Sequence, residues 1–262
     1  MKLNSPKIRL DQLIVNLGLA ESREKAKSLI LAGKITGEKG QLLKPGSMVT
    51  QDFQLKFKTA LPYVSRGGEK LDPALAYFNF DCRNLIALDI GASTGGFTDC
   101  LLQKGVKKIY ALDVGKNQLH QKLRSDPRVV VKDEINARYL KPQDLPEKVD
   151  LITIDVSFIS LTLILPKLKP LLKAEGKIIA LIKPQFEAGK EKVKKGGIVK
   201  DKAVHKEVLT KILSFAEQEG LYPVAIFPTP SLPRKNQEFL LWLETNPLKS
   251  ASIDEVILRA TS

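Results

Sequence analysis

A glycine-rich loop at residues 89–98 carries residue types that can bind a ligand through the backbone. It follows the apolar run 85–88, which predicts a buried parallel strand, and it precedes residues 99–104, which predict a helix. Glycines at such a junction let a ligand approach the backbone and the N-terminus of the helix. Asp113 lies at the end of a second apolar strand, 22 residues after Gly91, where a carboxylate can accept a ribose hydroxyl. The spacing predicts an adenosine-containing cofactor.

Four charged residues stand at the ends of predicted elements that face the same crevice: Lys70, Asp155, Lys183 and Glu238. A lysine at the end of a buried strand is costly unless a carboxylate meets it, and the neighbouring strand supplies Asp155. A lysine acts as a base only when its pKa falls well below its ordinary value of about 10.4. Burial and a second cation lower that pKa, whereas a carboxylate raises it. Two neighbouring lysines could set this balance, with the two acids compensating the buried charge.

The composition limits the classes of protein that this chain can belong to. Its 262 residues are 43% hydrophobic, which is enough for one large core and a small additional domain. No window approaches 18 uninterrupted apolar residues, so we expect no transmembrane helix. The N-terminus has no apolar signal-peptide segment, so we expect a cytoplasmic protein. The net charge of +13 predicts a polyanionic partner, either nucleic acid or an anionic membrane surface.

The two cysteines, Cys82 and Cys100, do not have the spacing of metal ligands. The chain has only two histidines, so we predict no metal site. Buried thiols are the simplest interpretation of both cysteines.

The N-terminal residues 1–58 carry a net charge of +6, from eleven Lys/Arg and five Asp/Glu. The apolar spacing predicts helices over 9–17 and 22–32, with Ser22 as the N-cap of the second. Short strands between turn residues are expected at 34–36, 47–49 and 53–57. These features predict a small basic α/β module.

Residues 59–69 are punctuated by glycine and proline and are expected to link this module to the rest of the chain. From Leu85 onward, apolar strands alternate with helical patterns, which predicts a parallel sheet with helices on both faces. Asp201 is expected to cap a helix through Glu219. No helix fits between the last two strands, so we expect them to pair antiparallel. The predicted strands are 85–90, 108–114, 128–132, 150–156, 177–183, 222–227 and 239–244.

The glycine loop also distinguishes between cofactors. A dinucleotide fingerprint needs glycine at position 93, which is serine, and a phosphate-binding P-loop needs Gly-Lys-Ser/Thr, which is absent. The loop resembles the first motif of S-adenosylmethionine (SAM) methyltransferases, and a parallel sheet that ends in an antiparallel hairpin resembles the class I methyltransferase fold. The resemblance implies that Asp89 holds the SAM ammonium, Asp113 the ribose, and Asp133, with Glu134 as a neighbouring competitor, the adenine amino group. The predicted cofactor-binding residues are Asp89, Gly91, Ala92, Ser93, Gly95, Gly96, Phe97, Thr98, Asp113, Val114, Asp133 and Asp155.

Three stretches of the N-terminal module resemble an S4 domain: Arg9-Leu-Asp11, Ser22-Arg23-Glu24-Lys25-Ala26 and Ala32-Gly33-Lys34-Ile35. S4 domains bind structured RNA through their helix pair, so the resemblance implies an RNA-binding module over residues 1–58. The alternative is a basic helical hairpin without a ligand, because charge runs alone are weak evidence. The predicted RNA-binding residues are Arg9, Arg23, Lys25, Lys27, Lys34 and Arg66.

The set of two lysines and two acids is similar to the tetrad of RNA ribose 2′-O-methyltransferases of the FtsJ type, whose domain is expected over residues 70–262. With the S4-like module, the chain resembles the TlyA (hemolysin A) family of ribosomal RNA methyltransferases. One departure is Arg234-Lys235, where the family usually has glycines, which puts the shape of the loop before Glu238 in question. Further matches are Ser65-Arg66-Gly67, residues 91–98, Asp126-Pro127-Arg128-Val129, Ser157-Phe158-Ile159-Ser160-Leu161 and Lys183-Pro184-Gln185-Phe186-Glu187.

The family resemblance implies methylation of ribose 2′-hydroxyls of ribosomal RNA cytidines, in one or both subunits, by a monomer that uses SAM and no metal. Lys183 would activate the hydroxyl, Asp155 would position Lys183, and Lys70 and Glu238 would orient the ribose, with much of the acceleration from alignment of oxygen, methyl and sulfur. The basic segment 187–197 either closes over RNA or is a solvated loop. Two other functions are considered: a non-catalytic RNA-binding protein on a methyltransferase scaffold, and a membrane-active hemolysin, for which the sequence has no apolar span or strong amphipathic helix.

Overall fold

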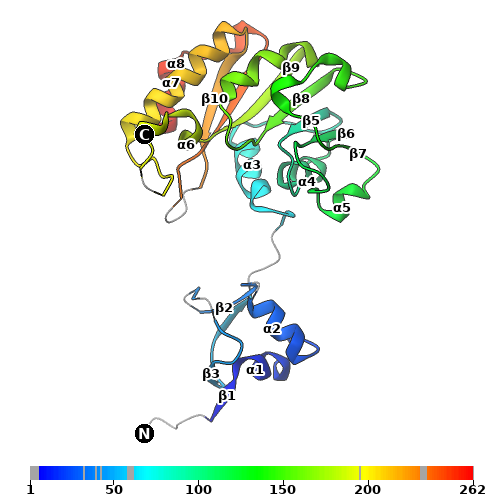
Figure 1. The fold of residues 1–262 in the computed structure, drawn as a ribbon, viewed down its shortest axis with the longest axis vertical. Coiled ribbons are helices and arrows are strands. Elements are labelled where there is room, and N and C mark those ends of the chain that lie inside the picture. The colour runs from blue at the N-terminus through cyan, green and yellow to red at the C-terminus, as the bar shows by residue number, and fades with distance from the viewer. Residues whose placement is uncertain are drawn as a thin grey trace. The chain divides into compact units, whose positions relative to one another are not determined.

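The computed structural model describes residues 6–31, 33–38, 40–41, 43–57, 62–194, 196–230 and 235–261. The chain divides into two compact units, Met1–Pro62 and Tyr63–Ser262 (Figure 1). Among the described residues, no helix is both long enough and apolar enough to cross a membrane.

The first unit packs two helices against short strands. Its helices are α1 (Leu10–Asn16) and α2 (Arg23–Leu31). Strand β1 (Lys7–Arg9) pairs antiparallel with β3 (Met48–Thr50), and β2 (Ile35–Gly37) pairs antiparallel with β4 (Leu55–Phe57). The predicted helix pair and short strands are therefore present, and β1 is an additional strand. The buried side chains that form the core of this unit are Leu10, Leu13, Ile14, Ala26, Ile30, Ile35 and Val49.

The second unit is built on a seven-stranded sheet with the order β10-β11-β9-β8-β5-β6-β7. Six strands run in the same direction, whereas β11 pairs antiparallel with both of its neighbours, β9 and β10. The predicted antiparallel hairpin at the end of the chain is therefore confirmed. The strands are β5 (Ile86–Ile90), β6 (Lys108–Leu112), β7 (Val129–Lys132), β8 (Val149–Ile154), β9 (Leu172–Ile182), β10 (Tyr222–Pro228) and β11 (Phe239–Glu244).

Apolar side chains cover both faces of this sheet, because successive residues of a strand point to opposite sides. On β9, Ile178 and Ala180 belong to one core and Ile179 and Leu181 to the other. The first core includes side chains of α7 (Lys202–Gln218) and α8 (Ile253–Thr261), and the second includes side chains of the other main helices. Those helices are α3 (Arg66–Tyr77), α4 (Gly96–Gln103) and α5 (Gln121–Arg124).

The connections on either side of β8 differ from the predicted helices, because they contain only 3₁₀ turns. Pro142, Pro166 and Pro170 each lie in one of these turns, and a proline provides no backbone N–H for a continuous α-helix. A short helix, α6 (Pro184–Glu187), follows β9. The 3₁₀ turns of the unit are Ala137–Tyr139, Pro142–Asp144, Leu161–Leu163, Leu165–Lys167, Lys169–Leu171, Lys190–Lys192 and Pro247–Lys249.

The predicted linker, residues 59–69, extends too far at its C-terminal end. Residues 59–61 lie outside the described residues, and from Tyr63 onward the chain belongs to the second unit. Ser65 caps α3 by accepting a hydrogen bond from the Gly67 amide. A Cβ at Gly68 would lie 2.2 Å from the Tyr63 ring. Gly68, one of the glycines that indicate a linker in the sequence, is therefore required by close packing at the start of a helix.

Candidate functional site

The glycine loop turns sharply between β5 and α4. Gly91 has φ of +80° and Gly95, the N-cap of α4, has φ of +96°, both in the region that favours glycine. A Cβ at Gly91 would lie 2.6 Å from the carbonyl oxygen of Asp155. Ser93, between the two glycines, also has a positive φ of +48°. The loop thus lies directly against the end of β8, which brings the predicted cofactor loop to the predicted catalytic acid.

Asp113, directly after β6, holds this loop in place. Its carboxylate accepts hydrogen bonds from the amides of Ser93 and Gly115, each at 2.8 Å. Val114 beside it is 67% exposed, which is unusual for a large apolar side chain. Asp113 remains partly exposed and adjoins the loop as the sequence predicts.

Asp89 is not accessible to a ligand, although its predicted role requires contact with the SAM ammonium. Its side chain is fully buried, and its two oxygens accept hydrogen bonds from the hydroxyls of Thr98 at 2.6 Å and Thr153 at 2.8 Å. Burial raises the pKa of Asp89 to about 6, and the two threonine hydroxyls oppose that shift. The prediction that Asp89 holds an ammonium directly is therefore wrong for this structure, because none of its carboxylate surface is accessible. Asp89 instead ties β5 to α4 and β8 beneath the loop.

Asp133, after β7, is also held by neighbouring groups. It accepts a hydrogen bond from the Asn117 amide at 3.1 Å and forms an ion pair of 2.7 Å with Arg124. These contacts lower the pKa of Asp133 below its ordinary value, the Asn117 amide having the larger effect. The competing acid Glu134 pairs with Lys116 at 3.3 Å. Neither acid lines the cavity beside the glycine loop.

The two lysines of the predicted tetrad each pair with one of its acids. Lys183 Nζ lies 2.6 Å from Asp155 Oδ1, and Lys70 Nζ lies 2.6 Å from Glu238 Oε2. Lys183 directly follows β9 and Asp155 directly follows β8, its parallel neighbour in the sheet. All four side chains are only partly exposed. The structure therefore arranges the tetrad as two lysine–carboxylate pairs.

The pairs line two adjoining cavities. A cavity of about 180 Å³ lies beside the glycine loop, and a larger one of about 690 Å³ lies beside it, with Ser65 and Gly67 in the walls of both. The smaller is lined by Ser65, Gly67, Gly91, Ala92, Ser93, Thr94, Gly96, Phe97, Asp155, Ser157 and Lys183. The larger is lined by Ser65, Arg66, Gly67, Glu69, Lys70, Gln185, Gly196, Ile198, Thr229, Pro230, Lys235, Asn236 and Glu238.

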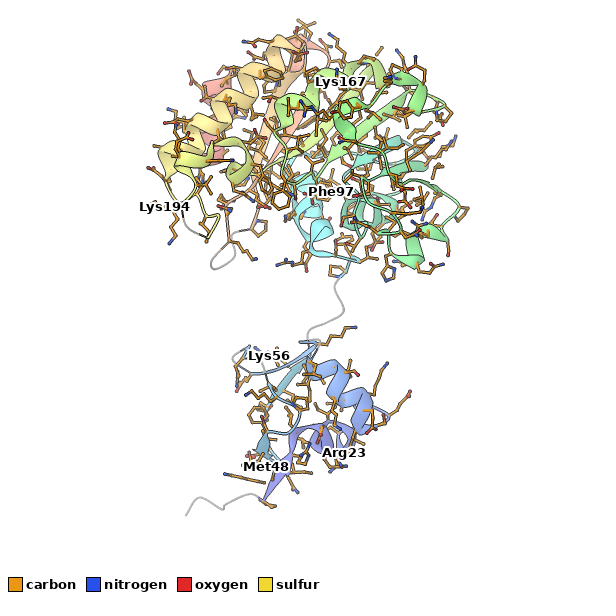
Figure 2. All side chains as sticks on the ribbon, viewed as in Figure 1. Arg23, Met48, Lys56, Phe97, Lys167 and Lys194 are labelled. Atoms are coloured by element: carbon orange, nitrogen blue, oxygen red, sulfur yellow. The ribbon has the colours of Figure 1, made fainter. Side chains whose placement is uncertain are left out.

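The smaller cavity suits the amino-acid and methyl end of SAM better than the whole molecule. Ligand pockets typically measure about 300–1,000 Å³, so a cavity of this size holds part of an adenosine-containing cofactor. A Cβ at Gly96 would lie 2.3 Å from Ser65 Oγ and would fill this wall. Phe97, the second residue of α4, is buried inside the unit and completes it (Figure 2). Asp113 and Val114 are accessible to solvent but do not line this cavity.

Ser157 and Phe158, which follow Asp155, are not among the site residues predicted from the sequence. Ser157 Oγ accepts a hydrogen bond from Lys183 Nζ at 3.0 Å. Phe158 is 90% exposed with φ of +63°, a strained conformation for an aromatic residue, and its ring centroid lies 4.9 Å from that of Phe186. Their position directly after a strand-ending acid, in a motif already matched to the family, was the available signal.

The predicted RNA-binding cations of the first unit lie on its surface. Arg9 and Arg23 are exposed, and both pair with the buried carboxylate of Asp11, Arg9 at 2.8 Å and Arg23 at 3.4 Å (Figure 2 labels Arg23). The Arg9 hydrogen bonds in particular lower the pKa of Asp11 to about 2. Lys25 and Lys34 are exposed and Lys27 is partly exposed, whereas Arg66 begins α3 and lines the larger cavity of the second unit.

The cysteines are both buried, as predicted, and burial raises the pKa of each thiol to about 12. They are therefore poor nucleophiles at neutral pH. Within the described ranges, no group of three or more His, Cys, Asp or Glu side chains is placed to bind a metal.

The strand order, with one antiparallel strand inserted between the last two positions of a parallel sheet, and the glycine loop at its carboxyl edge define a class I SAM-methyltransferase fold, here preceded by a small basic domain. Residues 63–245 match the family model of FtsJ-like methyltransferases, and residues 8–51 match that of S4 domains. The chain belongs to the TlyA/hemolysin A family, in which an S4 domain precedes an FtsJ-like methyltransferase domain.

Three relatives illustrate how far the similarity extends. The candidate rRNA methyltransferase YqxC of Bacillus subtilis is 50% identical over 92% of this chain and 87% of its own length. The 16S/23S rRNA (cytidine-2′-O)-methyltransferase TlyA of Mycobacterium tuberculosis is 39% identical over 97% of both chains. A solved structure from Streptococcus thermophilus, described as a candidate hemolysin, is 43% identical with a TM-score of 0.72, covering 97% of this chain and 95% of its own.

Proposed function

We propose that this protein transfers a methyl group from SAM to the ribose 2′-hydroxyl of a cytidine in ribosomal RNA. The observation that carries the proposal is the pair of adjoining cavities, because each contains one lysine–carboxylate pair and they share a wall at Ser65 and Gly67. The smaller cavity has the glycine loop expected of a cofactor site, and the larger has the volume of a nucleotide site. The name of the Mycobacterium tuberculosis relative supports cytidine in ribosomal RNA as the substrate.

The cofactor supplies an electrophilic methyl group carried on a sulfonium. In the proposed reaction Lys183 activates the 2′-hydroxyl, whose oxygen forms the new bond to the methyl carbon while the sulfur–carbon bond breaks. For this step Lys183 is the neutral amine, which donates its two hydrogens to Asp155 and Ser157, accepts the hydroxyl proton on its lone pair and then releases a proton to solvent. Asp155 and Ser157 hold that nitrogen at 2.6 and 3.0 Å, so its direction is fixed before the acceptor enters. Fixed alignment of this kind accounts for a large part of enzymatic rate acceleration.

The second pair orients the acceptor. Lys70 comes from α3 and Glu238 lies just before β11, so their contact joins two walls of the larger cavity. A carboxylate and an ammonium can together accept from and donate to the hydroxyls of a ribose. Arg66 and Lys235 in the same walls supply positive charge for the adjacent phosphates. The exposed ring of Phe158 supplies a surface on which a base can stack.

The RNA is bound first, in this proposal, by the S4 domain. Its exposed cations contact phosphates, which gives affinity and orientation without reading the sequence. The net charge of +13 over the chain strengthens this electrostatic attraction to RNA.

The test is methylation of unmodified ribosomal subunits and of naked ribosomal RNA with labelled SAM, followed by mapping of the labelled nucleotide. We expect label on a ribose 2′-oxygen of a cytidine. Label on a base atom would contradict the assignment of the acceptor. RNA binding without any transfer would favour a non-catalytic RNA-binding protein, and liposome leakage caused by the pure protein would favour a membrane-active one.

A further inference from the structure

Two chain segments, each of which begins with one residue of the tetrad, contact each other at several positions besides the Lys183–Asp155 pair. We call residues 155–161, which follow β8, the β8 segment, and residues 183–187, which follow β9, the β9 segment. Lys183, at the start of the β9 segment, donates to Ser157 in the β8 segment at 3.0 Å. The remaining contacts between the segments are the rings of Phe186 and Phe158, with centroids 4.9 Å apart, and the hydrogen bonds that Ser160 and Leu161 donate to Glu187.

Glu187 makes the contact with the largest cost of desolvation, because it is a buried acid. The residue is only 5% exposed, yet it carries a carboxylate. Its Oε2 accepts from the Ser160 hydroxyl at 2.6 Å and its Oε1 accepts from the Leu161 amide at 2.8 Å. The only cation nearby among the described residues is Lys211, whose Nζ lies 4.0 Å from Oε2. Burial raises the pKa of Glu187, and the hydrogen bonds from the β8 segment oppose that shift.

A buried carboxylate is unfavourable unless hydrogen bonds replace its lost hydration. Among the described residues, both hydrogen-bond donors to the Glu187 carboxylate belong to the β8 segment, so the burial of Glu187 and the turn of that segment require each other. The turn needs such support, because Phe158 within it has φ of +63°. The other end of the segment is fixed separately, since the Asp155 amide donates to the carbonyl of Ile90 at 2.9 Å.

We propose that Glu187 is a positioning residue for methyl transfer, which holds the β8 segment in the conformation that places Asp155 and Ser157 against Lys183. Lys183 is the N-cap of α6 and Glu187 is the last residue of that helix, so Glu187 joins the two segments through contacts separate from the ion pair. Its effect on the rate rests on the proposed function, whereas its effect on the β8 segment does not.

The first test compares three variants in methylation assays with saturating SAM and RNA. Glu187→Ala removes both hydrogen bonds, so we expect kcat to fall by about tenfold or more while the dissociation constants for SAM and RNA stay within about twofold. Glu187→Gln should recover most of the rate, because its amide oxygen can accept from Leu161 and its NH₂ group can donate to the Ser160 hydroxyl.

Glu244→Ala is the matched control. Glu244 is also 5% exposed and pairs with one lysine, Lys249 at 3.4 Å, but it lies at the end of β11 remote from Glu238. A purely structural role for Glu187 predicts that both alanine variants lose thermal stability without a specific loss of kcat. That result, or a Glu187→Gln variant as slow as Glu187→Ala, would overturn the proposal. If Glu187→Ala does not fold, Ser160→Ala removes one of the two hydrogen bonds and should lower kcat by about threefold.

Hydrogen exchange provides a readout that needs no activity. The Leu161 amide is bound to Glu187, so peptides covering 157–161 should exchange faster in Glu187→Ala than in the unmodified protein, with no such change in Glu244→Ala. Unchanged exchange would contradict the proposal even if the rate fell. If the unmodified protein methylates no RNA, the proposed function fails, and the exchange experiment still decides whether Glu187 holds the β8 segment.

Discussion

Lys183 Nζ lies 2.6 Å from Asp155 Oδ1 at the carboxyl ends of two neighbouring parallel strands, β9 and β8. The carboxyl edge of a parallel sheet is where open α/β folds bind ligands. A second oxygen, Ser157 Oγ, accepts from the same nitrogen, so the lysine end is held on two sides beside the glycine loop. The position of this nitrogen is therefore fixed by two side chains that directly follow β8.

Replacement of Lys183 by alanine should remove most of the methyl transfer and leave SAM binding largely intact. A positioned acid–base group contributes about 10²–10⁴-fold to a rate, so we expect a loss of that order in single-turnover assays with labelled SAM. Lys177→Ala is a suitable control, because Lys177 lies in the middle of the same strand and lines neither cavity. Near-normal transfer by Lys183→Ala, with SAM bound in calorimetry, would show that another group activates the hydroxyl.

Replacement of Gly91 by alanine should weaken SAM binding. The new Cβ would lie 2.6 Å from the Asp155 carbonyl oxygen, in a backbone with φ of +80°, so the loop or the end of β8 must move. We expect the dissociation constant of SAM to rise by at least about tenfold, which corresponds to roughly 1.4 kcal/mol.

Gly18→Ala separates this effect from backbone strain alone. Gly18 has a similar φ of +69°, but nothing lies within 4 Å of its Cβ position. This variant should destabilise the first unit by about 1 kcal/mol and leave SAM binding unchanged. Equal SAM affinity in the two variants would mean that the close approach of Gly91 to Asp155 is not needed for the cofactor site.

The positions of most site residues followed from the sequence, because apolar runs locate the strands and the ends of parallel strands share one edge. Asp155, Lys183 and Asp113 were placed correctly at strand ends for this reason. The antiparallel hairpin was also predictable, since too few residues separate β10 and β11 for a helix. The N-cap of α7 was predicted at Asp201, and its side chain does accept from the Ala203 amide.

The contacts between distant segments could not be predicted from the sequence. Asp89 lies near the end of β5 as predicted, but only the fold brings Thr98 and Thr153 to its two oxygens and removes it from the cavity. Gly68 indicates a linker when taken alone, and only its packing against Tyr63 at the start of α3 explains it. The exposure of Phe158 depends equally on the turn that Glu187 supports.

Replacement of Arg9 and Arg23 by glutamine should weaken RNA binding without affecting SAM. Both arginines are exposed and are held by Asp11, so their direction is set before RNA is bound. Each lost phosphate contact should reduce the salt dependence of log K by about one unit of slope. Arg83→Gln is the control, because Arg83 pairs with Asp81 over the same sequence spacing, but in the second unit. An unchanged salt slope in the double variant would place the RNA surface elsewhere.

Asp89 should make the stability of the protein depend on pH in an unusual direction. Its pKa is raised from 3.8 to about 6 in the folded state, so between these values the folded state binds a proton that the unfolded chain has lost. The free energy of unfolding therefore falls as pH rises through this window. A shift of about two units corresponds to roughly 3 kcal/mol. At neutral pH the charged carboxylate is retained in spite of this cost, with Thr98 and Thr153 as its partners.

Urea denaturation of the unmodified protein and of Asp89→Asn at several pH values measures this contribution. Asparagine cannot ionise, so the stability of the unmodified protein relative to the variant should decrease by roughly 2.4 kcal/mol between pH 4 and pH 7. Other acids, such as Asp11 with its pKa of about 2, occur in both proteins and cancel in the difference. A difference that stays constant over this range would mean that Asp89 titrates as it does in the unfolded chain, and that its burial beneath the glycine loop is less complete than its contacts indicate.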